Sequence, residues 1–121
     1  MIKKLDWSNG NIYAYEARGK MTKQENIQVF NELREGISRY GKVRIFVRMP
    51  KMARPLPSAL SERFRFAKEH LRNIERYVLV TDIPCIGYIV RVSGFFTGIE
   101  FRNYNSGDEL LAKTWIEARH V

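Results

Sequence analysis

The chain has 121 residues, of which 45% are hydrophobic and 28% charged, and its formal net charge is +8. This length fits one domain over residues 1–121, and the apolar content argues against a disordered chain. No run of about 18 apolar residues is present, which argues against a membrane-spanning helix, and the single Cys85 excludes an intramolecular disulfide. We therefore expect a protein of the reducing cytoplasm.

The first elements are predicted to be two antiparallel strands. Residues 5–7 and 11–15 are strand-like, and the Asn9-Gly10 pair between them favours a tight hairpin turn because both residues tolerate positive φ.

A helix is predicted next. Thr22 and Glu25 have the spacing of a capping box, and Gly41 suits a left-handed helix end. Between them, apolar residues recur at helical spacing, namely Ile27, Phe30, Leu33 and Ile37.

The middle of the chain predicts a strand, a loop and a second helix. Residues 43–49 form the strand, and three prolines then interrupt regular structure at Pro50, Pro55 and Pro57. From Ser58 onward an amphipathic stripe follows, made of Leu60, Phe64, Ala67, Leu71 and Ile74. Residues 77–81 are almost continuously apolar, which predicts a strand in the middle of the sheet.

The last third predicts a helix, a strand and a final helix. Residues 84–96 are interpreted as a helix because a strand over residues 99–104 needs a crossover of about a dozen residues to lie parallel to its predecessor. Ser106 and Glu109 have capping-box spacing and begin the last helix, with an apolar stripe of Leu111, Trp115 and Ala118.

This order predicts an α/β fold. An N-terminal antiparallel hairpin is followed by alternating helices and strands, giving a mostly parallel five-stranded sheet with about four helices. Arg44 and Arg48 alternate with apolar residues along one strand, so we expect one face of the sheet to be partly exposed to water.

A further comparison rests on several short segments, namely residues 19–22, 41–44, 59–60 with Phe64 and Phe66, 73–80, 95–96 and 102–104. They resemble the SpoIIAA-like family of small bacterial proteins, whose fold is related to STAS domains and, more loosely, to CRAL-TRIO lipid-binding domains. The resemblance covers nearly the whole chain and implies a STAS-like fold, but its residues are core and turn positions rather than catalytic ones.

The phosphorylation motif of STAS regulators is absent. Their Asp-Ser-Ser-Gly-like turn at the start of the second helix is replaced here by residues 54–61. Ser58 and Ser61 lie close by, and whether either is phosphorylated is left open.

The positive charge is concentrated in one segment. Residues 42–76 hold ten of the 21 Lys and Arg residues but only three acids. The end of a parallel strand and the following helix start commonly bind ligands, so we predict an anion or partner site there. Its candidate residues are Arg48, Lys51, Arg54 and Arg63. The alternative is a solvated charged face.

Other candidate residues carry weaker signals. Phe66 lies away from the apolar stripe of its helix, where it covers a loop or forms a partner interface. Cys85, His70 and His120 have no ligand or catalytic partner at suitable spacing. No metal, cofactor or enzymatic activity is therefore predicted.

The preferred hypothesis is a non-enzymatic binding or regulatory domain that recognises a protein, a small anion or a hydrophobic ligand. Two alternatives stay open: a lipid carrier of CRAL-TRIO-like type, and a basic domain that binds nucleic acid or an anionic membrane. A homodimer is plausible if a second copy covers the exposed sheet face or Phe66.

Overall fold

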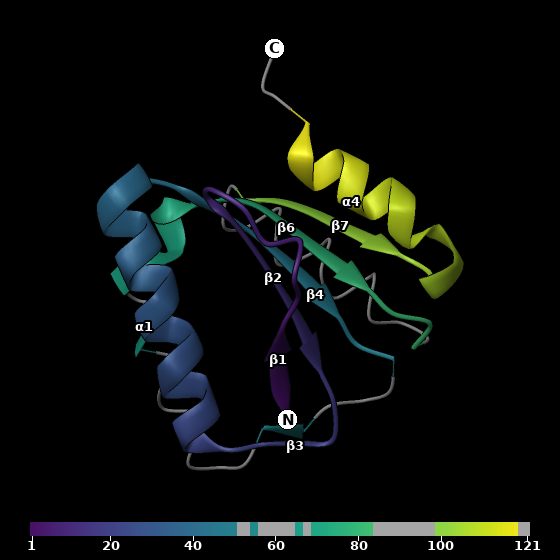
Figure 1. The fold of residues 1–121 in the computed structure, drawn as a ribbon, viewed down its shortest axis with the longest axis horizontal. Coiled ribbons are helices and arrows are strands. Elements are labelled where there is room, and N and C mark those ends of the chain that lie inside the picture. Colours follow the sequence, from purple (N-terminus) through teal and green to yellow (C-terminus); the bar gives the residue numbers. More distant parts are fainter. Residues whose placement is uncertain (51–53, 56–64, 67–68, 84–98, 119–121) are drawn as a thin grey trace.

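The computed structural model describes residues 1–50, 54–55, 65–66, 69–83 and 99–118. Its main sheet has five strands in the order β1-β2-β4-β6-β7 (Figure 1). The strands are β1 (Ile2–Lys4), β2 (Ile12–Ala17), β4 (Val43–Arg48), β6 (Ile74–Val80) and β7 (Glu100–Tyr104). Two short strands, β3 (Lys20–Met21) and β5 (Arg54–Pro55), pair separately.

The sheet is mixed rather than mostly parallel. β1 runs antiparallel to β2, whereas the pairings of β2 with β4, β4 with β6 and β6 with β7 are parallel. β4 occupies the middle of the strand order, so the prediction that residues 77–81 form the central strand is wrong by one position. The parallel joining of β6 to β7 agrees with the expected crossover.

The described residues contain two complete α-helices, α1 (Lys23–Tyr40) and α4 (Glu109–Glu117), where about four helices were expected, and residues 65–66 and 69–70 are helical within the second helix predicted. Most of the helices expected over residues 58–74 and 84–96 lie outside the described residues. The predicted end of the first of these is wrong, because Leu71–Asn73 is a 3-10 turn and Ile74 already belongs to β6.

α1 forms as its sequence predicts. Thr22 accepts a hydrogen bond from the Glu25 amide, and the Glu25 carboxylate accepts one from the Thr22 amide, which completes the capping box. The helix ends at Gly41, whose φ of 82° is easily reached only by glycine.

The N-terminal hairpin is present, but its first strand is shifted. β1 comprises Ile2–Lys4, not residues 5–7, while Asn9 and Ile12 form the expected tight turn around Gly10 at φ 58°. The ladder is interrupted because the Ser8 hydroxyl accepts a hydrogen bond from the Ala14 amide and donates to the Leu5 carbonyl.

α4 begins without the expected capping box. Ser106 lies in a separate 3-10 turn, Ser106–Asp108, and Asp108 precedes α4 with no side-chain cap. The predicted stripe is also wrong, because Leu111 is exposed while Ala112 and Ile116 are buried. Ser106 bonds instead to Asp82, a partner that is distant in sequence.

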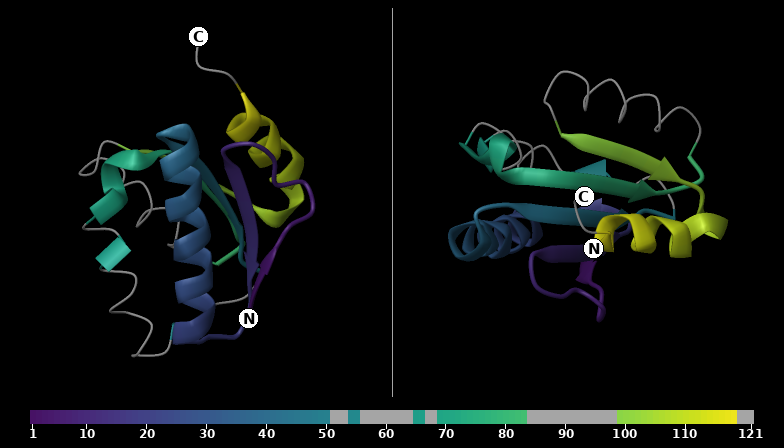
Figure 2. Two further views of the ribbon diagram at one scale, coloured as in Figure 1. Left: turned by 60° about the vertical axis from the view of Figure 1, so that its left-hand side comes forward. Right: turned by 90° about the horizontal axis from the view of Figure 1, so that it is seen from above.

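The helices cover opposite faces of the sheet (Figure 2). On the α1 face, Leu33 packs with Tyr15, Val43 and Ile45. On the α4 face, a second cluster contains Ala14, Phe46, Val78, Val80, Ala112 and Ile116. Alternate residues of the same strands therefore serve two separate cores.

Candidate functional site

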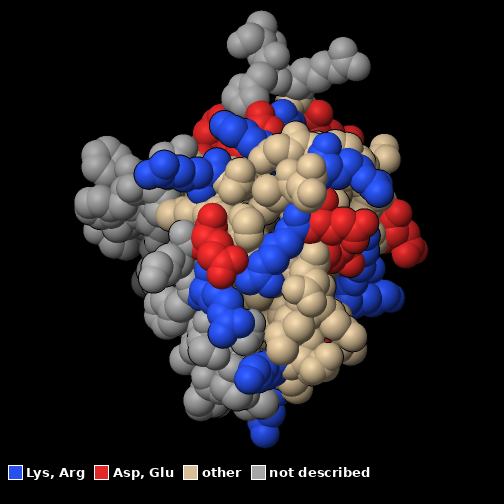
Figure 3. All heavy atoms as spheres, turned by 90° about the vertical axis from the view of Figure 1, so that its left-hand side faces the viewer, with Lys and Arg blue, Asp and Glu red and all other residues tan. Residues whose placement is uncertain are grey.

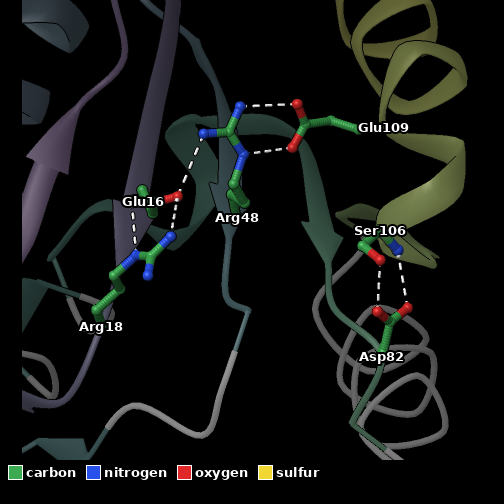
Figure 4. A network of polar contacts seen from close by, with 6 residues as sticks. All are labelled: Glu16, Arg18, Arg48, Asp82, Ser106 and Glu109. Carbon is green, nitrogen blue, oxygen red and sulfur yellow. Dashed lines mark hydrogen bonds and ion pairs between the residues drawn. The ribbon is translucent and has the colours of Figure 1, made fainter.

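A polar network lies at the edge where the parallel strands end (Figure 4). Arg48, the last residue of β4, donates two hydrogen bonds to the Glu109 carboxylate of α4, one of them from Nη2 to Oε2 at 2.7 Å. It also donates from Nη1 to Glu16 Oε1 at 3.2 Å. Arg18 donates from Nε to Glu16 Oε2 at 2.9 Å. Two arginines and two glutamates thus connect β2, β4 and α4.

The charges in this network balance. The hydrogen bond from Arg18 lowers the pKa of Glu16, and the bond from Arg48 adds to this effect. The hydrogen bond to Glu109 raises the pKa of Arg48. Because both carboxylates already hold the Arg48 guanidinium, its charge is compensated within the protein.

Arg48 is the one member of the predicted anion patch whose side chain the structure describes. For Arg54 the backbone is described, as part of β5 paired with Lys20 of β3. Lys51 and Arg63 lie outside the described residues. The grouping of these four bases into one site therefore stays a prediction.

Phe66 is part of the core and not of an exposed edge. It is 4% exposed, and its ring stacks on Phe30 of α1 at 4.7 Å between centroids. The helical wheel placed the Phe66 side chain away from the apolar stripe of its own helix. In the structure that side chain packs against α1. So small an exposed area offers little contact to a partner in this conformation.

The face predicted to be partly wet is instead covered by α4. Arg44 is 8% exposed and Arg76 is 7% exposed. Arg44 Nη1 donates to the carbonyls of Ile116, at 2.8 Å, and Ala118. Arg76 Nη1 donates to the carbonyls of Trp115 at 2.8 Å and Ala118 at 3.1 Å. These carbonyls end α4, where cations are favoured by the helix dipole.

An apolar cavity of about 430 Å³ lies between α1 and the sheet. α1 contributes Asn26, Val29, Phe30 and Leu33, and the other described lining residues are Ile2, Tyr15, Ala17, Met21, Ile45, Val47, Met49, Phe66, Ile74 and Tyr77. In Figure 1 the axis of α1 and the strands diverge toward β3, the end at which these α1 residues lie.

The other end of the α1 layer is closely packed. A Cβ atom added to Gly36 would lie 2.2 Å from the Tyr13 hydroxyl oxygen, so glycine lets the helix approach the sheet there. Gly36 lies in the C-terminal half of α1, beyond the residues that line the cavity. On the sheet side, the cavity lining extends to Ile45, which pairs with Tyr13.

The polar groups of the cavity wall are hydrogen-bonded within the protein. The Tyr15 hydroxyl donates to Glu32 Oε1 at 2.8 Å, and Asn26 Nδ2 donates to the Thr22 carbonyl at 2.8 Å. Burial, together with the bond to Glu32, raises the pKa of Tyr15. Tyr15 and Asn26 therefore form part of the wall without carrying charge.

Sequence reasoning did not identify this cavity. Phe30 and Leu33 were interpreted as a helix stripe that fills the core, and helical spacing is the same for a filled face and a hollow one. The looser likeness to CRAL-TRIO domains pointed to an apolar pocket, but to none of these residues.

Two further observations concern the described part of the chain. It contains no group of three or more His, Cys, Asp or Glu placed to hold a metal ion. None of its helices is long and apolar enough to cross a membrane.

The two layers of helix on a mixed sheet define an α/β domain, and comparisons with known proteins agree. The chain matches the SpoIIAA-like family over residues 12–117 and belongs to that family. A comparison with curated proteins gave no match. A similar solved structure is an uncharacterised protein of the DUF3478 family with a SpoIIAA-like fold from Shewanella loihica PV-4. It is 18% identical, with a TM-score of 0.72 over 96% of this chain and 92% of the other.

Proposed function

We propose that this SpoIIAA-like domain is a non-enzymatic binding protein that holds a hydrophobic small molecule between α1 and the sheet. The observation that supports this proposal is the cavity of about 430 Å³, whose described lining residues are all uncharged. Small-molecule pockets commonly have volumes of about 300–1,000 Å³ and are mostly apolar. A hydrophobic ligand that filled this space would gain van der Waals contacts with its apolar walls.

The anion hypothesis has less support among the described residues. Arg48 is held by two carboxylates, so an incoming anion must compete with Glu16 and Glu109. Basic and acidic side chains are interspersed on the α1 side of the molecule (Figure 3). Examples are the pairs of Lys4 with Glu32 and of Arg34 with Glu69. On this face, the described basic side chains therefore form no unbroken positive patch of the kind that binds nucleic acid or an anionic membrane.

Two measurements test the proposal. Native mass spectrometry of the purified protein detects a co-purifying ligand, and titration with the uncharged dye Nile red measures binding by fluorescence. We expect saturable binding of one dye molecule per chain.

A cavity-filling variant and a surface variant locate the bound dye. Ala17→Leu places a larger side chain in the cavity and should weaken dye binding at least tenfold. Leu111→Ser removes an exposed apolar side chain of α4 and should leave binding unchanged. The proposal is wrong if the wild-type protein binds no dye, or if the surface variant alone loses binding.

A further inference from the structure

The described lining of the cavity is uncharged, which restricts the chemistry of its ligand. Each described lining residue has a neutral side chain. The Tyr15 hydroxyl and the Asn26 amide already donate to Glu32 and to the Thr22 carbonyl. Moving an ionised group from water into such surroundings is costly unless a partner of opposite charge receives it.

Ion-paired carboxylates lie directly behind two lining residues. Glu25 Oε2 accepts a hydrogen bond from the Ile2 amide at 2.7 Å, and Glu32 Oε1 accepts one from the Tyr15 hydroxyl at 2.8 Å. Ile2 and Tyr15 both line the cavity. Glu25 is paired with the N-terminal ammonium at 3.7 Å and Glu32 with Lys4 at 2.7 Å, so their charges are compensated. Because both donors are already used, neither offers a hydrogen bond to an anionic group in the cavity.

We infer that the ligand is an uncharged hydrophobic molecule, such as a long-chain alcohol, ester or isoprenoid, and not a fatty-acid anion. This inference rests on the proposed function and specifies the ligand class of the same cavity. Shape and apolar contact with residues such as Phe30, Leu33 and Ile45 provide the recognition.

Arg34 is the cation that would bind the ligand if the ligand were an anion, so it provides a test of this inference. Its guanidinium lies 5.6 Å from the centroid of the Phe66 ring, and its Nε is 3.8 Å from Glu69 Oε2. Its buried Nη2 has no hydrogen-bond partner among the described residues. An anionic head group that reached past Phe66 would bind there.

The experiment compares two ligands of equal chain length, dodecan-1-ol and dodecanoate, as competitors of Nile red at pH 8, where dodecanoate is ionised. Both are used below their aggregation concentrations. We expect the alcohol to displace the dye at a concentration at least tenfold lower than the anion, and Ala17→Leu to weaken alcohol binding.

The outcomes separate the inference from the proposed function. Equal or stronger displacement by dodecanoate overturns the inference and leaves hydrophobic binding intact. Arg34→Met then shows whether the carboxylate is bound at Arg34, because only that variant would lose the anion while keeping the alcohol. If the dye itself does not bind, the proposed function fails as well.

Discussion

The α4 face of the sheet is filled and partly ionic, whereas the α1 face has a cavity whose described lining is uncharged. On the α4 face, Phe46 has no exposed surface and meets the Trp7 ring edge-on at 4.7 Å, with Arg44 and Arg76 buried at the end of α4. On the α1 face, Phe30 and Leu33 line the cavity. Both faces are built on the same strands. They differ in the helix that covers each face and in the alternate strand side chains that point toward that helix.

The two helix layers are held to the sheet by different kinds of interaction. Buried arginine hydrogen bonds are directional, and they fix where α4 ends relative to β4 and β6. Apolar contacts on the α1 face are not directional, so that layer tolerates a variable occupant. The α4 layer is therefore fixed relative to the sheet, and the ligand that we propose would lie in the α1 layer.

The largest expected difference between the faces comes from removing a phenylalanine ring from each. Phe46→Ala deletes a fully buried ring in a filled core and should lower the free energy of unfolding by about 3–5 kcal/mol. Phe30→Ala enlarges a cavity that already exists and should cost about half as much or less. Urea unfolding of both variants measures this, and equal losses would contradict the distinction between the faces.

The arginines at the end of α4 provide the next test. Arg44→Met removes the donor to the Ile116 carbonyl, one of the two donors to the Ala118 carbonyl, and the ion-pair partner of Glu75, and should cost about 3 kcal/mol. The matched control is Arg39→Met in the exposed Arg39–Glu35 pair, with an expected loss below about 0.5 kcal/mol. If both variants unfold at the same urea concentration, the arginine does not hold α4.

Two alanines of β2 compare the faces with a single kind of substitution. Ala14→Leu adds volume to the filled α4 face and should destabilise the protein by about 1–3 kcal/mol. Ala17→Leu adds the same volume next to the cavity and should be nearly neutral for stability. Thermal unfolding of both variants without ligand tests this. A larger loss for Ala17→Leu would mean that the cavity is not available space.

Local signals account for what the sequence predicted well. The capping box of Thr22 and Glu25, and Gly41 at the other end, defined α1 within one residue because the partners are near neighbours in the chain. The strand over residues 43–49 and the parallel joining of the last strand were also correct, since alternation and crossover length are visible in sequence.

Contacts between distant residues account for the errors. Ser106 has the spacing of a capping residue, but its hydroxyl bonds to Asp82. Arg44 was interpreted as facing water because its partners, the carbonyls of Ile116 and Ala118, are more than 70 residues away. The cavity could not be predicted because periodicity gives the direction of a side chain and not the distance to the opposite layer.

The smallest expected effect is the loss of stability at acidic pH that comes from Glu16, on the α4 side of the sheet. The hydrogen bond from Arg18 lowers the pKa of Glu16 below its usual value of 4.5, and Arg48 contributes further. The stabilisation from Glu16 is therefore complete above pH 4.5 and is lost as the pH falls through the lowered pKa. Because Arg18 is largely exposed and Arg48 partly so, we expect about 0.5–1 kcal/mol at neutral pH.

Glu16→Gln measures this contribution against the wild type. The variant should be less stable at pH 7, and the difference should shrink as the pH falls through the lowered pKa of Glu16, below which the wild-type carboxylate is protonated as well. Arg18→Met combined with Glu16→Gln gives the coupling energy of the pair, which should vanish over the same pH range.

Because no charged residue lines the described part of the cavity, Nile red binding by folded wild-type protein should not follow this titration. A binding curve that changes with Glu16 would mean that the two faces are coupled through β2, and that the α4 layer also adjusts to the occupant of the cavity.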